Sequence, residues 1–85
     1  MPRVDRDELA NVIAVNLARA RDRAGLSKTA LAQEAGVTEA SLRNWEKAQN
    51  MPRTAELVSV ADALGVSVHW LLGRETGSWT PGGAQ

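Results

Sequence analysis

Apolar residues recur at steps of three and four over the first quarter of the chain, which is the spacing of one buried helical stripe. The stripe contains Leu9, Val12, Ile13, Asn16, Leu17, Ala20 and Ala24. We therefore predict a helix from Asp7 to about Arg23. Arginines in its last turns suit the negative end of the helix dipole, and Gly25 is a suitable left-handed stop.

Four shorter helices are predicted downstream, over residues 28–35, 39 to about 48, 54–64 and 68–73. Ser27, Thr38 and Ser67 are suitable N-caps, and Gly36 and Gly65 are suitable ends. The apolar residues expected to face the core of the middle helices are Leu31, Ala32, Ala35, Leu42, Trp45, Leu57, Val60, Ala61 and Leu64. No stretch alternates with the period of a strand. The pattern predicts a compact all-α domain of five short helices.

The connection between the second and third predicted helices is very short. Only Gly36 and Val37 lie between the second helix and the next cap. Two helices joined by a three- or four-residue turn containing glycine form a helix-turn-helix unit. Such a unit needs a small residue at the helix crossing, which Ala32 supplies, and a residue tolerant of positive φ four positions later. Leu42 and Trp45 have the spacing to anchor the third helix, so we predict a helix-turn-helix here.

The remaining side chains of the third helix should point outward or lie at its rim. They are Glu39, Ala40, Arg43, Asn44 and Lys47. Arg and Lys suit guanine, Asn suits adenine, Glu can accept from the amino group of cytosine, and Ala can contact a thymine methyl group. Exposed helix faces are commonly charged for solubility alone. The short glycine-containing turn before this helix is the feature that favours a nucleic-acid contact.

The charge of the chain is balanced, with ten basic and ten acidic side chains. Most nucleic-acid-binding domains are basic, so the total counts against DNA binding. Residues 19–53, however, hold seven basic and four acidic side chains and carry a net charge of +3. A local positive field can exist on a chain of zero net charge.

Several classes of site and location are not expected. There is no cysteine, and His69 is the only histidine, so no disulfide, metal site or cofactor is predicted. The first residues contain no apolar signal segment, and no apolar run approaches the roughly 20 residues that span a bilayer. No paired carboxylates, nucleophile with a base, or phosphate loop is visible, so we predict no enzyme. We expect a soluble cytoplasmic protein with no membrane contact.

Four stretches resemble the Cro/phage-repressor type of helix-turn-helix domain, the XRE-like family of bacterial and phage regulators. They are RDRAGLSKTALAQEAGV, LRNWE, MPR and LVSVADALGVSVHWLLG, and the resemblance covers roughly residues 9 to 73. It implies a five-helix domain of the lambda-repressor-like DNA-binding type. It also implies binding to operator DNA, commonly as a dimer, through a recognition helix at residues 39–47.

The resemblance also implies roles for individual residues. Base contacts are implied for Lys28, Thr38, Glu39, Ala40, Arg43 and Asn44, phosphate contacts for Ser27, Arg43, Lys47 and Arg53, and an orienting ion pair for Arg21 with Glu46. Lys28 stands where the family often has Gln, and Arg43 where it often has Ser. Both changes add positive charge, which favours phosphate attraction. Glu39 would be repelled by phosphates, so it either reads cytosine or acts as an electrostatic brake.

The domain boundaries follow from composition. We interpret residues 1–6 as a flexible arm, 7–73 as the DNA-binding domain, and 74–85 as a flexible Gly/Pro-rich tail. Arg3 and Arg6 in the arm could reach a minor groove. Trp79 in the tail is either exposed to solvent or folded onto a partner subunit.

Two functions from different classes remain open. The first is a sequence-specific regulator that binds double-stranded DNA, a small bacterial or phage Cro-like repressor on a pseudo-palindromic operator. It would act as a homodimer, one that could form only on DNA. The second is a protein-interaction module on the same fold, such as an antitoxin or anti-repressor acting mainly through a partner protein. The balanced charge supports the second function.

Overall fold

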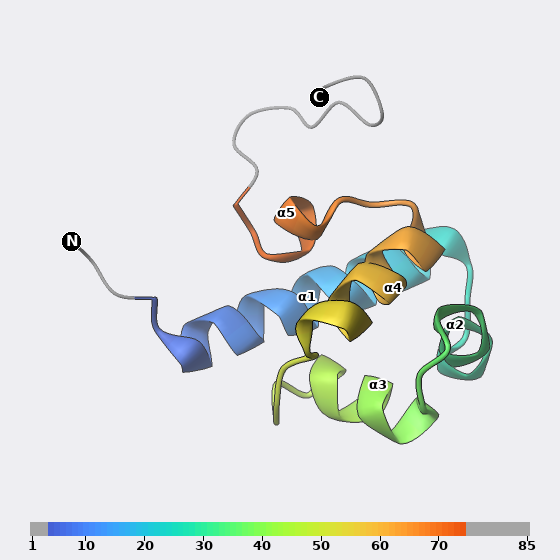
Figure 1. Cartoon of the computed structure of the whole chain (residues 1–85), viewed down its shortest axis with the longest axis horizontal. Helices are drawn as coiled ribbons and strands as arrows, with labels where there is room; N and C mark the ends of the chain where they lie inside the picture. Colours follow the sequence, from blue (N-terminus) through green and yellow to red (C-terminus); the bar gives the residue numbers. More distant parts are fainter. Residues whose placement is uncertain (1–3, 75–85) are drawn as a thin grey trace.

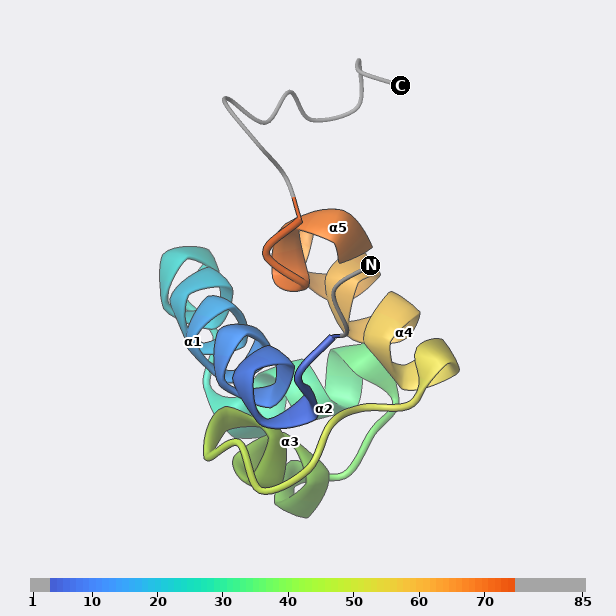
Figure 2. The same ribbon diagram turned by 90° about the vertical axis from the view of Figure 1, so that its left-hand side faces the viewer.

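The computed structural model describes residues 4–74, and these residues form five helices without a strand. Helix α1 spans Arg6–Ala24, α2 Lys28–Ala35, α3 Glu39–Glu46, α4 Thr54–Leu64 and α5 Val68–Leu71. The all-α fold predicted from the apolar pattern is confirmed. In Figures 1 and 2, α3 lies at one side of the molecule and α5 at the opposite side, with α1 and α4 between them.

The core gathers side chains from all five helices. Its buried members are Leu17, Leu31, Ala32, Leu42, Trp45, Val60, Ala61 and Leu71. Helix α2 packs against α3 and α4, and α1 packs against α3, α4 and α5. The predicted core positions of the middle helices are buried or packed against this cluster. In α1 the buried stripe includes Ala10 and Ala14, which the prediction omitted, whereas Ala24 is exposed.

The predicted caps set most helix boundaries. The hydroxyl of Ser27 accepts a hydrogen bond from the Ala30 amide, and that of Thr38 accepts one from the Ser41 amide. A side-chain oxygen at this position satisfies an amide that the first turn of a helix leaves without a partner. Helix α1 begins at Arg6, one residue earlier than predicted, because the Asp5 carboxylate accepts hydrogen bonds from the amides of Asp7 and Glu8. Asp5 and Arg6 therefore belong to the folded domain, whereas residues 1–3 and 75–85, including Arg3 and Trp79, lie outside the described residues.

The predicted end of the third helix near Ala48 is wrong, because α3 ends at Glu46. Ala48 has φ 59°, and among residues 4–74 it is the one non-glycine residue with positive φ. The amide of Ala48 donates to Trp45 O, and that of Gln49 donates to Asn44 O, which satisfies the last carbonyls of the helix. A left-handed residue ends the helix here as at Gly25 and Gly36, but without the glycine that would have marked it in the sequence.

The predicted end of the last helix at residue 73 is also wrong, because α5 ends at Leu71. Asn16 of α1 explains how so short a helix is held. Its Nδ2 donates to Trp70 O at 3.1 Å and to Leu71 O at 3.3 Å. Gly73 follows with φ 71°, and a Cβ there would lie 2.7 Å from Val12 Cγ1. The end of α5 is therefore fastened to α1 by one amide side chain and one close backbone approach.

The conformation of Ala48 leads to a prediction for stability. We expect Ala48→Gly to raise the free energy of unfolding by about 0.5–1 kcal/mol, because the left-handed conformation costs a non-glycine residue about 1–2 kcal/mol and the added chain entropy of glycine offsets part of this. Ala18→Gly, the same substitution inside α1, should instead lower it by about 1 kcal/mol. Urea unfolding of both variants measures whether the two changes in the free energy of unfolding have opposite signs. Equal decreases would contradict the left-handed conformation of Ala48.

Candidate nucleic-acid interface

The corner between α2 and α3 has the geometry expected of a helix-turn-helix. Gly36 has φ 72°, and the amide of Val37 donates back to Ala32 O at 3.0 Å, closing α2. Thr38 follows as the N-cap, and α3 begins at Glu39. Leu42 is 0% and Trp45 3% exposed, so one side of α3 is committed to the core. The opposite side of α3 is thereby directed away from the protein.

Helix α3 lies at one side of the molecule (Figure 1). The predicted contact residues belong to α3 with its two caps, to the start of α2 with its N-cap, and to the residue before α4. Those exposed are Ser27, Thr38, Glu39, Ala40, Arg43, Lys47 and Arg53, and those partly buried are Lys28 and Asn44. Lys47 follows the last residue of α3 and is its C-cap, and Arg53 precedes the first residue of α4. We call this set of positions the α3 face.

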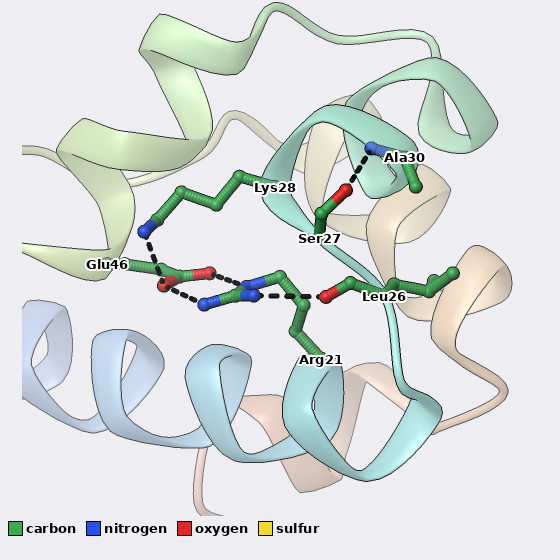
Figure 3. A network of polar contacts seen from close by, with 6 residues as sticks. All are labelled: Arg21, Leu26, Ser27, Lys28, Ala30 and Glu46. Atoms are coloured by element: carbon green, nitrogen blue, oxygen red, sulfur yellow. Dashed lines mark hydrogen bonds and ion pairs between the residues drawn. The ribbon is translucent and has the colours of Figure 1, made fainter.

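The Glu46 carboxylate joins the first three helices (Figure 3). Arg21 Nε lies 2.7 Å from Glu46 Oε2 and Arg21 Nη2 3.1 Å from Oε1, so the guanidinium donates to both oxygens. Arg21 Nη1 also donates to Leu26 O at 3.0 Å. Lys28 Nζ lies 4.0 Å from Glu46 Oε1. Lys28 is therefore directed toward Glu46 in the free protein, although the resemblance implied a base contact for it.

The two oppositely charged groups of this pair are both mostly shielded from solvent, at 16% exposure for Arg21 and 8% for Glu46. The hydrogen bonds to Glu46 raise the pKa of the Arg21 guanidinium, and partial burial opposes them. Arg21 thus stays charged throughout the physiological range. A bidentate arginine–carboxylate pair has a defined geometry as well as charge. This pair sets the position of the C-terminal end of α3 relative to α1.

A second carboxylate lies at the other end of α3. Glu39 Oε1 accepts a hydrogen bond from the Thr29 hydroxyl of α2 at 3.0 Å, and Glu39 Oε2 lies 3.6 Å from Arg43 Nη2. The side chains of Glu39 and Arg43 remain about half exposed, at 45% and 48%. Thr29 was not predicted to belong to the site. The sequence predicts the crossing of α2 and α3, but not which exposed side chains meet across it.

The hydroxyls of the two helix caps at this surface differ in what they can still bind. Thr38 Oγ1 donates to Ser41 Oγ at 2.8 Å, so its hydrogen is already used within the protein. Ser27 Oγ accepts from the Ala30 amide, which leaves its hydrogen available for an outside acceptor such as a phosphate oxygen.

Residues 17–71 match the family model of the helix-turn-helix family HTH_3, and the chain belongs to this family. One similar solved structure is an HTH_3 family transcriptional regulator from Vibrio cholerae, with a TM-score of 0.76 and 30% identity. It matches 84% of this chain, which spans only 40% of the length of that protein. Another is a hypothetical transcription factor from Neisseria, with a TM-score of 0.73 and 26% identity over 85% of this chain and 83% of the other. No curated protein sequence matches the chain.

Residues 4–74 contain no group of three or more His, Cys, Asp or Glu side chains placed to hold a metal ion. Over the same residues, no helix has the length and apolar character needed to cross a membrane.

The two carboxylates of α3 differ in burial, which predicts unequal costs for the same substitution. We expect Glu46→Gln to lower the free energy of unfolding by about 1–3 kcal/mol, because it leaves the shielded Arg21 without a charged partner. Glu39→Gln should cost less than about 0.5 kcal/mol, because exposed ion pairs contribute little. Thermal and urea unfolding of the two variants test this difference, and equal destabilisation would show that Glu46 does not join the helices as described.

Proposed function

We propose that this protein is a sequence-specific regulator of transcription that binds double-stranded DNA through the α3 face. The observation that carries the proposal is the division of α3 into two sides. Leu42 and Trp45 are buried, while Ala40, Arg43 and Lys47 are exposed on the other side of the helix. An eight-residue helix is about 12 Å long, which is comparable to the width of a major groove. Membership of the HTH_3 family and likeness to transcription regulators support the same function.

The contacts we propose fall into two groups. Lys28, Thr38, Glu39, Ala40, Arg43 and Asn44 lie where base edges would be approached, and Ser27, Arg43, Lys47 and Arg53 lie where phosphates would be. Phosphate contacts position a protein on the duplex, whereas base contacts select the sequence. The pair Arg21–Glu46 would orient α3 without touching a base.

We propose further that the protein acts as a homodimer on a pseudo-palindrome, as a small Cro-like repressor in the cytoplasm of a bacterium. A single short recognition helix reads few base pairs, so a second copy lengthens the site. Two recognition helices entering successive major grooves would be about 34 Å apart, one turn of the duplex.

The alternative is a protein-interaction module on the same fold, such as an antitoxin or anti-repressor that acts through a partner protein. The balanced charge of the chain favours it, since ten basic and ten acidic side chains give no overall attraction to DNA. The carboxylates of Glu46 and Glu39, paired with Arg21 and Arg43, are part of this balance.

Selection of binding sites from a random duplex pool tests the proposal, followed by titration at several salt concentrations. We expect an enriched inverted repeat with half-site centres about one helical turn apart. Affinity for it should fall about 1,000-fold or more between about 50 and 200 mM salt, because phosphate contacts release counterions. Failure to enrich any sequence would favour the protein-interaction module.

Asn44 in the last turn of α3 and Lys47, the C-cap of α3, should act differently on the enriched site. We expect Asn44→Ala to relax preference at one base pair, with a loss of about 1–3 kcal/mol against the best site only. Lys47→Ala should weaken binding to all sequences alike and reduce the salt slope by about one. Competition titrations against single-base variants of the site distinguish the two. The proposed groups would be wrong if Lys47→Ala changed the preferred sequence.

A further inference from the structure

Glu39 has contacts in this protein that its place on the α3 face does not suggest. One carboxylate oxygen accepts from the Thr29 hydroxyl of α2 at 3.0 Å, and the other lies 3.6 Å from the Arg43 guanidinium one turn along α3. We propose that Glu39 is a positioning residue for Arg43, and that the unit Thr29–Glu39–Arg43 sets a base preference that Arg43 alone reads. This inference rests on the proposed function and specifies how its site selects a sequence.

The direction in which Glu39 holds Arg43 is the first reason. Side chains on a helix lean toward its N-terminus, so residues four apart meet on one side. Pairing with Glu39 therefore places the Arg43 guanidinium over the first turn of α3. In helix-turn-helix proteins the N-terminal residues of the recognition helix are the ones that contact base edges. Released from Glu39, the long Arg43 side chain could turn to a phosphate instead.

The chemistry of the two groups is the second reason. A guanidinium has five N–H donors in a fixed planar arrangement, and the contact with Glu39 leaves most of them available to guanine O6 and N7. Holding the plane of the guanidinium in advance reduces the freedom lost on binding. The Thr29 hydroxyl anchors the carboxylate to α2, so Glu39 is itself held from a second helix.

The same contacts distinguish this role from the two roles considered for Glu39 from the sequence. If Glu39 read cytosine, its oxygens would have to leave Thr29 and Arg43. If it were only an electrostatic brake, its charge would act on all DNA sequences equally and without dependence on Arg43. A positioning residue predicts a third behaviour, in which removing Glu39 affects sequence preference only while Arg43 is present.

The test is a double-mutant cycle on discrimination, defined as the ratio of affinities for the enriched site and for its single-base variants. A uniform change in electrostatics cancels in this ratio. The variants are Glu39→Gln, Arg43→Ala and the double mutant, with Asn44→Ala as a control on the same face. Glu39→Gln keeps an oxygen for Thr29 and removes the charge that holds Arg43. Thr29→Val and Thr29→Ser test the anchor, because only serine keeps the hydroxyl.

We expect Arg43→Ala to lose discrimination at one base pair by roughly 5- to 150-fold, the range of one bidentate base contact. Glu39→Gln should lose about twofold at the same base pair, because an exposed ion pair contributes little. The double mutant should lose no more discrimination than Arg43→Ala alone. In contrast, the losses of discrimination caused by Glu39→Gln and by Asn44→Ala should multiply when the two substitutions are combined. Thr29→Val should lose part of the same discrimination, and Thr29→Ser should retain it. Non-specific binding of Glu39→Gln should gain about one unit of salt slope, and Arg43→Ala should remove that gain.

The inference would be overturned if Glu39→Gln and Arg43→Ala lost discrimination at different base pairs and these losses multiplied in the double mutant. Glu39 would then be a base reader. Tighter binding to every sequence that persists in the double mutant would also overturn it and make Glu39 a brake. Both outcomes leave the proposed function intact. If the wild-type protein enriches no sequence at all, the proposed function fails first and this inference with it.

Discussion

The orientation of α3 depends on one carboxylate at its C-terminal end. Glu46 is 8% exposed and receives two hydrogen bonds from Arg21 of α1, while Lys28 of α2 lies 4.0 Å away. Taking a carboxylate out of water is costly unless charged donors replace the lost hydration, and Arg21 supplies them in bidentate geometry. The apolar contacts of Leu42 and Trp45 hold α3 against the core, but such contacts are not directional. The ion pair adds the direction, and it brings α1, α2 and α3 together at one point (Figure 3).

Carboxylates also decide how the positive charge of this surface is distributed. A count along residues 19–53 gives +3, but Arg21 is paired with Glu46 and Arg43 with Glu39. Lys47 and Arg53 are exposed without an ion pair within the described residues. The count of +3 already subtracts both carboxylates, so the pairing does not lower the net charge further.

The apolar pattern was sufficient to predict the fold, because helix periodicity, hydroxyl caps and glycine stops all act locally. The boundaries that failed were those without a local signal. Ala48 ends α3 in a conformation normally marked by glycine, and α5 ends early because Asn16, far away in the sequence, accommodates its last carbonyls. The Arg21–Glu46 pair was implied by resemblance and is present. The contact of Thr29 with Glu39 was missed, because it depends on the crossing of two helices and not on the residues next to either one.

Amide chemical-shift mapping can show whether the α3 face is the surface that contacts DNA. Nitrogen-15-labelled protein would be titrated with a short duplex of arbitrary sequence at low salt, because non-specific binding should already use the same surface. We expect perturbed amides at the start of α2, along α3 and around Arg53, with α5 on the opposite side unaffected (Figure 2). Perturbations gathered on α5 and the start of α1, or none at all, would contradict this expectation.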